Sequence, residues 1–91
     1  MTNISKINAN YKVSGNSETM KMEGNFTFGT FIENMNVSVE SIEGMYLGNV
    51  NYQERIDGNT TLNCNLPMQY MMDAITLLND IVADIYKEMT E

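Results

Sequence analysis

The sequence contains no histidine, which removes the commonest general base and the commonest metal ligand. A Ser–His or Cys–His catalytic pair is therefore excluded. The single cysteine, Cys64, excludes an internal disulfide, and its alternating apolar surroundings favour a structural role over a reactive thiol. No glycine-rich loop precedes a helical pattern, so a phosphate-binding loop is not indicated. We expect no catalytic residues, no metal site and no cofactor.

Basic residues are also scarce, since five Lys and Arg stand against 12 Asp and Glu, for a net charge of −7. Binding to nucleic acid or to an anionic membrane surface needs basic patches, so neither partner is expected. No stretch approaches about 18 consecutive apolar residues, and residues 1–10 lack the apolar core of a signal peptide. The expected location is cytoplasmic. A basic protein partner is compatible with this charge.

The last quarter of the chain, residues 67–89, has the period of one long amphipathic helix. Apolar residues fill both core positions of a heptad repeat throughout this stretch. They are Met68, Met71, Ile75, Leu78, Val82, Ile85 and Met89. Asn65 is a suitable N-cap, and Pro67 falls in the first turn, where a missing N–H costs nothing.

A second apolar stripe lies beside the heptad positions and consists of Tyr70, Ala74, Leu77 and Ile81. Together the two stripes cover about 200° of the helix, roughly twice the arc that packing on one sheet needs. The sequence therefore predicts a homo-oligomer, most simply a two-fold dimer, with the second stripe as its interface. The alternative is that a longer meander curls round the helix and covers this stripe within one chain.

Upstream of the helix, apolar and polar residues alternate as they do in half-buried β-strands. Turn signals divide this region into segments 4–14, 18–28, 31–41, 45–56 and 59–65. The sequence predicts a single α+β domain over 1–91, with an antiparallel meander of four to five strands in 1–66 and the helix 67–89 across one face. Gly24 and Gly48 on the inner face are predicted to leave room where the helix crosses.

Asparagine, which is normally depleted in strands, occurs here in four Asn-x-Asn pairs. The pairs are Asn8/Asn10, Asn34/Asn36, Asn49/Asn51 and Asn63/Asn65. Each pair is expected to point away from the core. An amide-rich sheet face can hydrogen-bond a partner, so Asn34, Asn36, Asn49 and Asn51 are candidate binding residues. The alternative is a solvated outer face in a chain of biased composition.

Three carboxylates, Asp80, Asp84 and Glu88, stack at four-residue spacing on the predicted helix, and we call them the acidic ridge. They repel one another near the negative end of the helix dipole, which suggests that they face a basic partner or a cation. The alternative, which we favour, is a solvated helix face.

Six of the nine methionines have two interpretations, namely Met20, Met22, Met35, Met68, Met71 and Met72. They can form an adaptable surface for varied partners, or they can fill the core, which their spacing favours.

These features predict a non-enzymatic small acidic interaction protein. By analogy of size and charge, it is an inhibitor of the kind encoded by phages and mobile elements, which binds and masks a surface of a host protein. The alternative is a small-ligand-binding module, with its site between sheet and helix or on the asparagine face. An enzyme that uses only carboxylates or tyrosines is the least favoured class.

Overall fold

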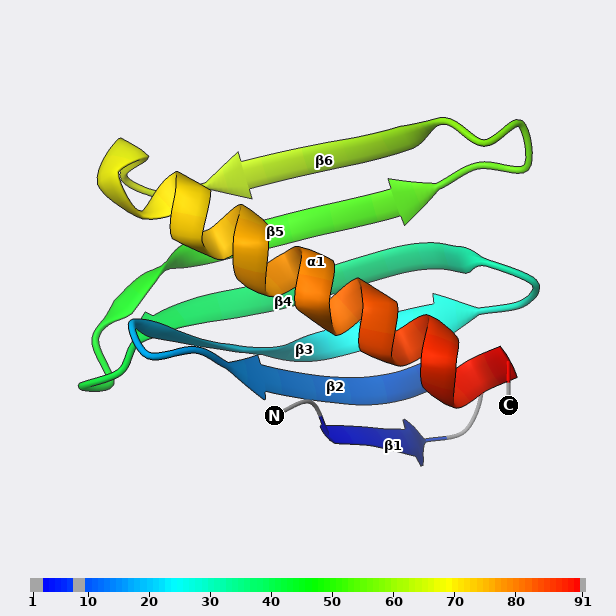
Figure 1. The fold of residues 1–91 in the computed structure, drawn as a ribbon, viewed down its shortest axis with the longest axis horizontal. Helices are drawn as coiled ribbons and strands as arrows, with labels where there is room; N and C mark the ends of the chain where they lie inside the picture. The colour runs from blue at the N-terminus through cyan, green and yellow to red at the C-terminus, as the bar shows by residue number, and fades with distance from the viewer. Residues whose placement is uncertain (1–2, 8–9, 91) are drawn as a thin grey trace.

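The computed structural model describes residues 3–7 and 10–90, and in this part of the chain six strands are followed by one helix. The elements are β1 (Asn3–Ile7), β2 (Asn10–Asn16), β3 (Met20–Phe28), β4 (Ile32–Ser41), β5 (Tyr46–Glu54), β6 (Thr60–Asn65) and α1 (Met68–Thr90). The strands form one antiparallel sheet in chain order, β1-β2-β3-β4-β5-β6 (Figure 1). The predicted α+β class and antiparallel meander are confirmed.

The prediction of four to five strands is wrong, because the segment 4–14 forms two strands instead of one. β1 pairs antiparallel with β2, so the chain reverses between Ile7 and Asn10. Such a short connection leaves no visible gap in an alternating pattern, and Asn8-Ala9 lacks the Asn-Gly or Asp-Gly signature of a tight hairpin. Asn8 itself lies outside the described residues.

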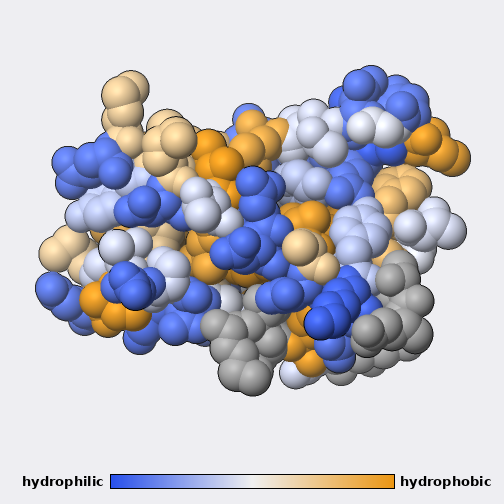
Figure 2. Space-filling view, in the orientation of Figure 1, coloured by the Kyte–Doolittle hydropathy of each residue, from blue (hydrophilic) through white to orange (hydrophobic). Residues whose placement is uncertain are grey.

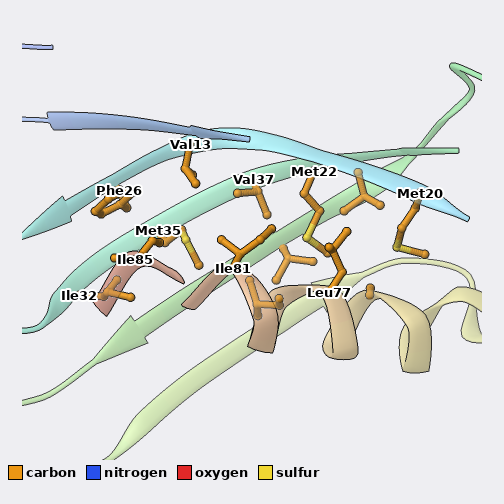
Figure 3. Close-up of a cluster of buried hydrophobic side chains, with 14 of the residues drawn as sticks. Val13, Met20, Met22, Phe26, Ile32, Met35, Val37, Leu77, Ile81 and Ile85 are labelled. Carbon is orange, nitrogen blue, oxygen red and sulfur yellow. The ribbon is translucent and has the colours of Figure 1, made fainter. Parts of the chain in front are cut away.

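A single cluster of buried apolar side chains combines residues of the strands with residues of α1. The strands β2 to β5 supply Val13, Met20, Met22, Phe26, Ile32, Met35, Val37, Val39 and Val50, the connection to the helix supplies Leu66, and α1 supplies Ala74, Leu77, Leu78, Ile81 and Ile85. Figure 1 shows α1 running diagonally in front of the sheet, and Figure 3 shows Leu77, Ile81 and Ile85 beside the strand side chains. The remaining sheet face, which we call the outer face, carries the polar side chains of the same strands.

The stripe that the sequence analysis assigned to a dimer interface belongs to this core. Ala74, Leu77 and Ile81 are 1%, 4% and 1% exposed, and Tyr70 is half-buried. The prediction that this stripe stands free of the sheet is therefore wrong. The stripe is covered within one chain, as the alternative has it, but by one face of the sheet and not by a meander that curls round the helix.

The buried face of α1 can be explained by its rotation about its own axis. At 100° per residue, the five buried positions of α1 fall within an arc of about 100°, which is what one sheet covers. This arc is centred near Ile81. Met68, a heptad residue, and Met72, which lies next to the heptad positions, point outward and are 84% and 74% exposed. The sequence showed a wide apolar arc, and packing selected a different part of it from the one predicted.

The two inner-face glycines are required by neighbouring strands and not by the helix. A Cβ atom on Gly24 would lie 1.8 Å from the backbone oxygen of Asn36 on β4. A Cβ on Gly48 would lie 1.8 Å from the backbone oxygen of Asn65, and Gly48 has a φ of 154° beside a shift in the β4–β5 register. The predicted reason for these glycines, a helix crossing, is therefore wrong.

The methionines divide between the two predicted roles. Met20, Met22 and Met35 are buried, and Met71 is half-buried against the core. Met68 and Met72 are exposed at the start of α1. Core filling thus describes the strand methionines, whereas the helix start presents two of them to the solvent.

Candidate interaction surface

The outer face of the sheet carries a row of asparagines, one on each of four adjacent strands. Asn25 pairs in register with Asn36, Asn36 with Asn51, and Asn51 with Asn63. The row therefore crosses the sheet from β3 to β6 with the strand spacing of about 4.8 Å between neighbours. Asn51 is half-buried, and the other three are exposed.

Further amides lie on both sides of this row. On one side, Asn49 and Asn65 are register partners two residues along their strands from Asn51 and Asn63. On the other side, Asn34 lies within hydrogen-bonding distance of Gln53. We call the whole set the amide face. It comprises Asn25, Asn34, Asn36, Asn49, Asn51, Gln53, Asn63 and Asn65.

Hydrogen bonds between neighbouring side chains hold the amide face in a defined arrangement. Asn51 Nδ2 donates to Asn36 Oδ1 and, at 3.4 Å, to Asn34 Oδ1. Gln53 Nε2 donates to Asn34 Oδ1 at 3.4 Å, and Asn65 Nδ2 donates to Asn49 Oδ1 at 3.1 Å. Each amide has more donor and acceptor capacity than these bonds use, so the face can also bind a partner.

Alternation along each strand explains why these residues share one face. On β4, Met35, Val37 and Val39 are buried, so the intervening Asn34 and Asn36 must point the other way. The predicted binding residues Asn34, Asn36, Asn49 and Asn51 are thus brought together on the outer face. Asn25 and Gln53 were not among the predicted binding residues. Alternation along their strands places both outward, but which residues lie next to them depends on strand register.

Two adjoining hollows lie on the outer face over the other half of the sheet. The first, of about 350 Å³, is lined mainly by polar residues of β2, β3 and β4. Its lining is Ser14, Gly15, Asn16, Lys21, Met22, Glu23, Ser38 and Glu40. The second shares Ser14 and Glu23 with it and adds Ser5, Lys12 and Val13. This region carries both signs of charge, in contrast to the neutral amide face.

A second polar cluster joins the sheet to α1 and was not found from the sequence. Tyr52 and Tyr86 both donate their hydroxyl hydrogens to the carboxylate of Glu54. The backbone N–H of Ile32 lies 3.3 Å from both Glu54 Oε1 and Tyr86 Oη. No local pattern distinguishes Glu54 from the exposed carboxylates, because two of its three partners, Ile32 and Tyr86, lie 22 and 32 residues away.

Burial raises the pKa of Tyr52 and of Tyr86, and the hydrogen bond of each to Glu54 adds to the effect. Both phenols therefore stay protonated at neutral pH and act as hydrogen-bond donors. A tyrosine nucleophile or base needs the opposite shift. The cluster is thus suited to holding α1 against β4 and β5.

No family model, curated protein or solved structure matches this chain.

The three carboxylates of the acidic ridge all belong to α1. Asp80, Asp84 and Glu88 are all exposed. Within the described ranges 3–7 and 10–90, no three acidic or cysteine side chains are grouped so that they could hold a metal ion. Binding of a basic partner by the ridge remains a prediction.

Burial raises the pKa of the half-buried Cys64 thiol, which lowers its thiolate fraction and its reactivity.

In the part of the chain that the structure describes, no helix combines the length and apolar character that crossing a bilayer requires.

Proposed function

We propose that this chain is a non-enzymatic interaction protein that binds a protein partner through its amide face. The observation that carries the proposal is the row formed by Asn25, Asn36, Asn51 and Asn63, one residue on each of four adjacent strands. Side-chain amides both donate and accept hydrogen bonds, as peptide groups and polar side chains of a partner surface do.

Two physical properties of the amide face favour binding. Its residues are neutral, so removing water from them costs less free energy than dehydrating charged groups would. The hydrogen bonds from Asn51 to Asn36 and from Asn65 to Asn49 already restrict the side chains, so less conformational entropy is lost on binding. An asparagine side chain also loses less conformational entropy when it becomes fixed than a lysine or glutamate side chain does.

The acidic ridge supports a basic partner in a different way. With a net charge of −7, the chain attracts a basic protein over a distance comparable with the Debye length, which raises the association rate. We assign steering to the ridge, because charge acts at a distance, and docking to the amides, because hydrogen bonds need direct contact. An inhibitor that masks the partner's surface is the form of this function that we propose.

A polar small-ligand site is the second candidate, and the 350 Å³ hollow on the outer face supports it. Lys21, Glu23 and Glu40 at its lining would suit a ligand that carries both charges. The hollow is open and polar, whereas small-molecule sites are mostly apolar and enclosed, so we rank this function second.

The test compares capture of partners from a lysate of the native host by tagged wild type, Asn36→Ala/Asn51→Ala and Asn79→Ala. Asn79 is an exposed asparagine of α1 and serves as a matched control. We expect a stoichiometric partner that the wild type and Asn79→Ala retain and the double variant loses, with melting temperatures checked for each. Equal capture by all three would contradict docking through the amide face.

A second arm of the same experiment addresses the ridge and the hollow. Glu88→Lys should slow association with a basic partner and make its rate less sensitive to salt, while leaving the dissociation rate almost unchanged. A thermal shift of the wild type with polar metabolites that Lys21→Ala abolishes would instead support the small-ligand site. If no protein is retained at all, the interaction proposal fails.

A further inference from the structure

Among the described residues 3–7 and 10–90, the last strand of the sheet, β6, has a strand neighbour on one side only. The sheet order ends at β6, and β6 pairs with β5 through residues Thr60–Asn65. In a strand of six residues, about three N–H and three C=O groups therefore point away from β5. We propose that two copies of this chain pair antiparallel through β6 and form one continuous sheet.

β6 lacks the features that protect exposed edge strands from pairing. Its sequence TTLNCN contains no charged residue and no proline. Natural edge strands are commonly blocked by lysine, proline, bulges or inward-pointing charges. The opposite edge, β1, is only five residues long and has Lys6 in its sequence.

Charge also selects β6 as the place where two copies can meet. Two chains that each carry −7 repel one another over most of their surfaces. The uncharged strand β6 is a segment along which two copies can approach without placing like charges opposite each other. An antiparallel pairing is self-complementary, as a closed two-fold interface requires.

Exposed apolar residues flank this edge at both ends. Ile56, in the β5–β6 turn, is 93% exposed, and Met68 and Met72 at the start of α1 are 84% and 74% exposed. Leu62 on β6 itself is 41% exposed. Figure 2 shows hydrophobic side chains standing out at the upper left and the upper right, which are the two ends of β6 in Figure 1.

Antiparallel pairing makes use of both ends at once. Because the two strands run in opposite directions, the helix start of each copy comes to the β5–β6 turn of the other. Met68 and Met72 of one copy then lie at the same end as Ile56 of its mate, and Leu62 lies beside residues of the mate's β6 on the same face of the sheet. Burial of these groups adds a hydrophobic contribution to the backbone hydrogen bonds.

The pairing uses the strand edge and leaves the amide face accessible. The row of Asn25, Asn36, Asn51 and Asn63 ends at β6, so a second copy extends it in the same plane with a second row. Dimerisation and partner binding are therefore separable, and either proposal can fail without the other.

The test measures the molar mass in solution by light scattering at hundreds of micromolar. Wild type should have twice the 10.3 kDa chain mass. Leu62→Lys places a charge at the edge and should weaken dimerisation by about tenfold or more while the circular dichroism spectrum is unchanged. Met45→Lys makes the same kind of change at the β4–β5 turn, where Met45 is 65% exposed, and should remain dimeric.

Cross-linking keeps the proposal testable if Leu62→Lys does not fold. In a Cys64→Ser background, single cysteines at Thr61, Leu62 or Asn63 scan for the residue on the two-fold axis. That residue faces its own copy at about 4.5–5.5 Å between Cα atoms, which is within disulfide range. A folded wild-type monomer of 10.3 kDa at these concentrations, or no cross-link at any of the three positions, overturns the proposal.

Discussion

At the scale of single residues, Glu54 links the sheet to α1. Its carboxylate accepts hydrogen bonds from Tyr52, Tyr86 and the backbone N–H of Ile32. These contacts join β4, β5 and α1 at one point, next to the edge-to-face packing of Tyr86 against Phe28 at 5.5 Å. Removing Glu54 would leave two half-buried phenols without their acceptor.

The raised pKa values of Tyr52 and Tyr86 predict a loss of stability in alkali. Below the ordinary tyrosine pKa of about 10, both phenols are protonated in the folded and unfolded chains, and their contribution is fully present. Above it the unfolded chain loses these protons first, so the free energy of unfolding falls as pH rises. Urea unfolding between about pH 9 and pH 12 measures this slope.

Variants identify the residues responsible for the slope. Tyr52→Phe/Tyr86→Phe should flatten it and cost about 1–3 kcal/mol at neutral pH, because two hydrogen bonds to a carboxylate are lost. Tyr46→Phe is the control, since Tyr46 is 62% exposed. A slope that persists in the double variant would assign the alkaline loss to other groups.

Gly24 gives a second residue-scale prediction. Gly24→Ala should destabilise the fold by about 2 kcal/mol or more, because the new Cβ would collide with the backbone of Asn36 and Val37, which cannot move aside. Gly29→Ala is the matched control, since its Cβ would meet only the flexible Glu33 side chain, at 3.1 Å. Chemical denaturation of both variants is the measurement, and equal stabilities would contradict the close approach of β3 and β4.

At the scale of elements, the rotation of α1 decides which of its apolar residues matter. Ile81→Ala should cost about 2–5 kcal/mol, because Ile81 is 1% exposed and its removal leaves a cavity. In dilute, monomeric protein, Met72→Ala should change stability by less than about 0.5 kcal/mol, because Met72 is 74% exposed in the single chain. The opposite ranking in thermal denaturation would show that the buried face of α1 is not centred on Ile81.

At the scale of the whole molecule, net charge and self-association oppose each other. The chain carries −7 within extents of 34 × 25 × 20 Å. At an ionic strength of about 0.01 M the Debye length of about 30 Å reaches across a second copy, and at 0.1 M it falls to about 10 Å. Salt should therefore strengthen pairing through the uncharged strand β6.

Sedimentation equilibrium of the wild type at these two ionic strengths measures the dimer dissociation constant. We expect this constant to fall several-fold in the higher salt, because repulsion is screened and β6 contributes no ion pairs. A rise would show that the copies meet through oppositely charged groups, such as the acidic ridge and a lysine.

The local periods of the sequence were enough to predict the helix and the faces of the strands, although they did not reveal the chain reversal between β1 and β2. Alternation about Met35, Val37 and Val39 places Asn34 and Asn36 outward whatever the rest of the chain does, because side chains of a strand alternate. The helical period likewise located α1 to within one residue at each end of the predicted 67–89. Both properties depend only on residues that are close in the chain.

Tertiary structure alone decided which residues meet across elements. Strand register brought Asn25, Asn36, Asn51 and Asn63 into one row, and the rotation of α1 buried Ala74, Leu77 and Ile81. Glu54 acquired Tyr86 as a partner in the same way. Register and rotation follow from the packing of the whole core, so they depend on contacts between distant residues that no local period contains.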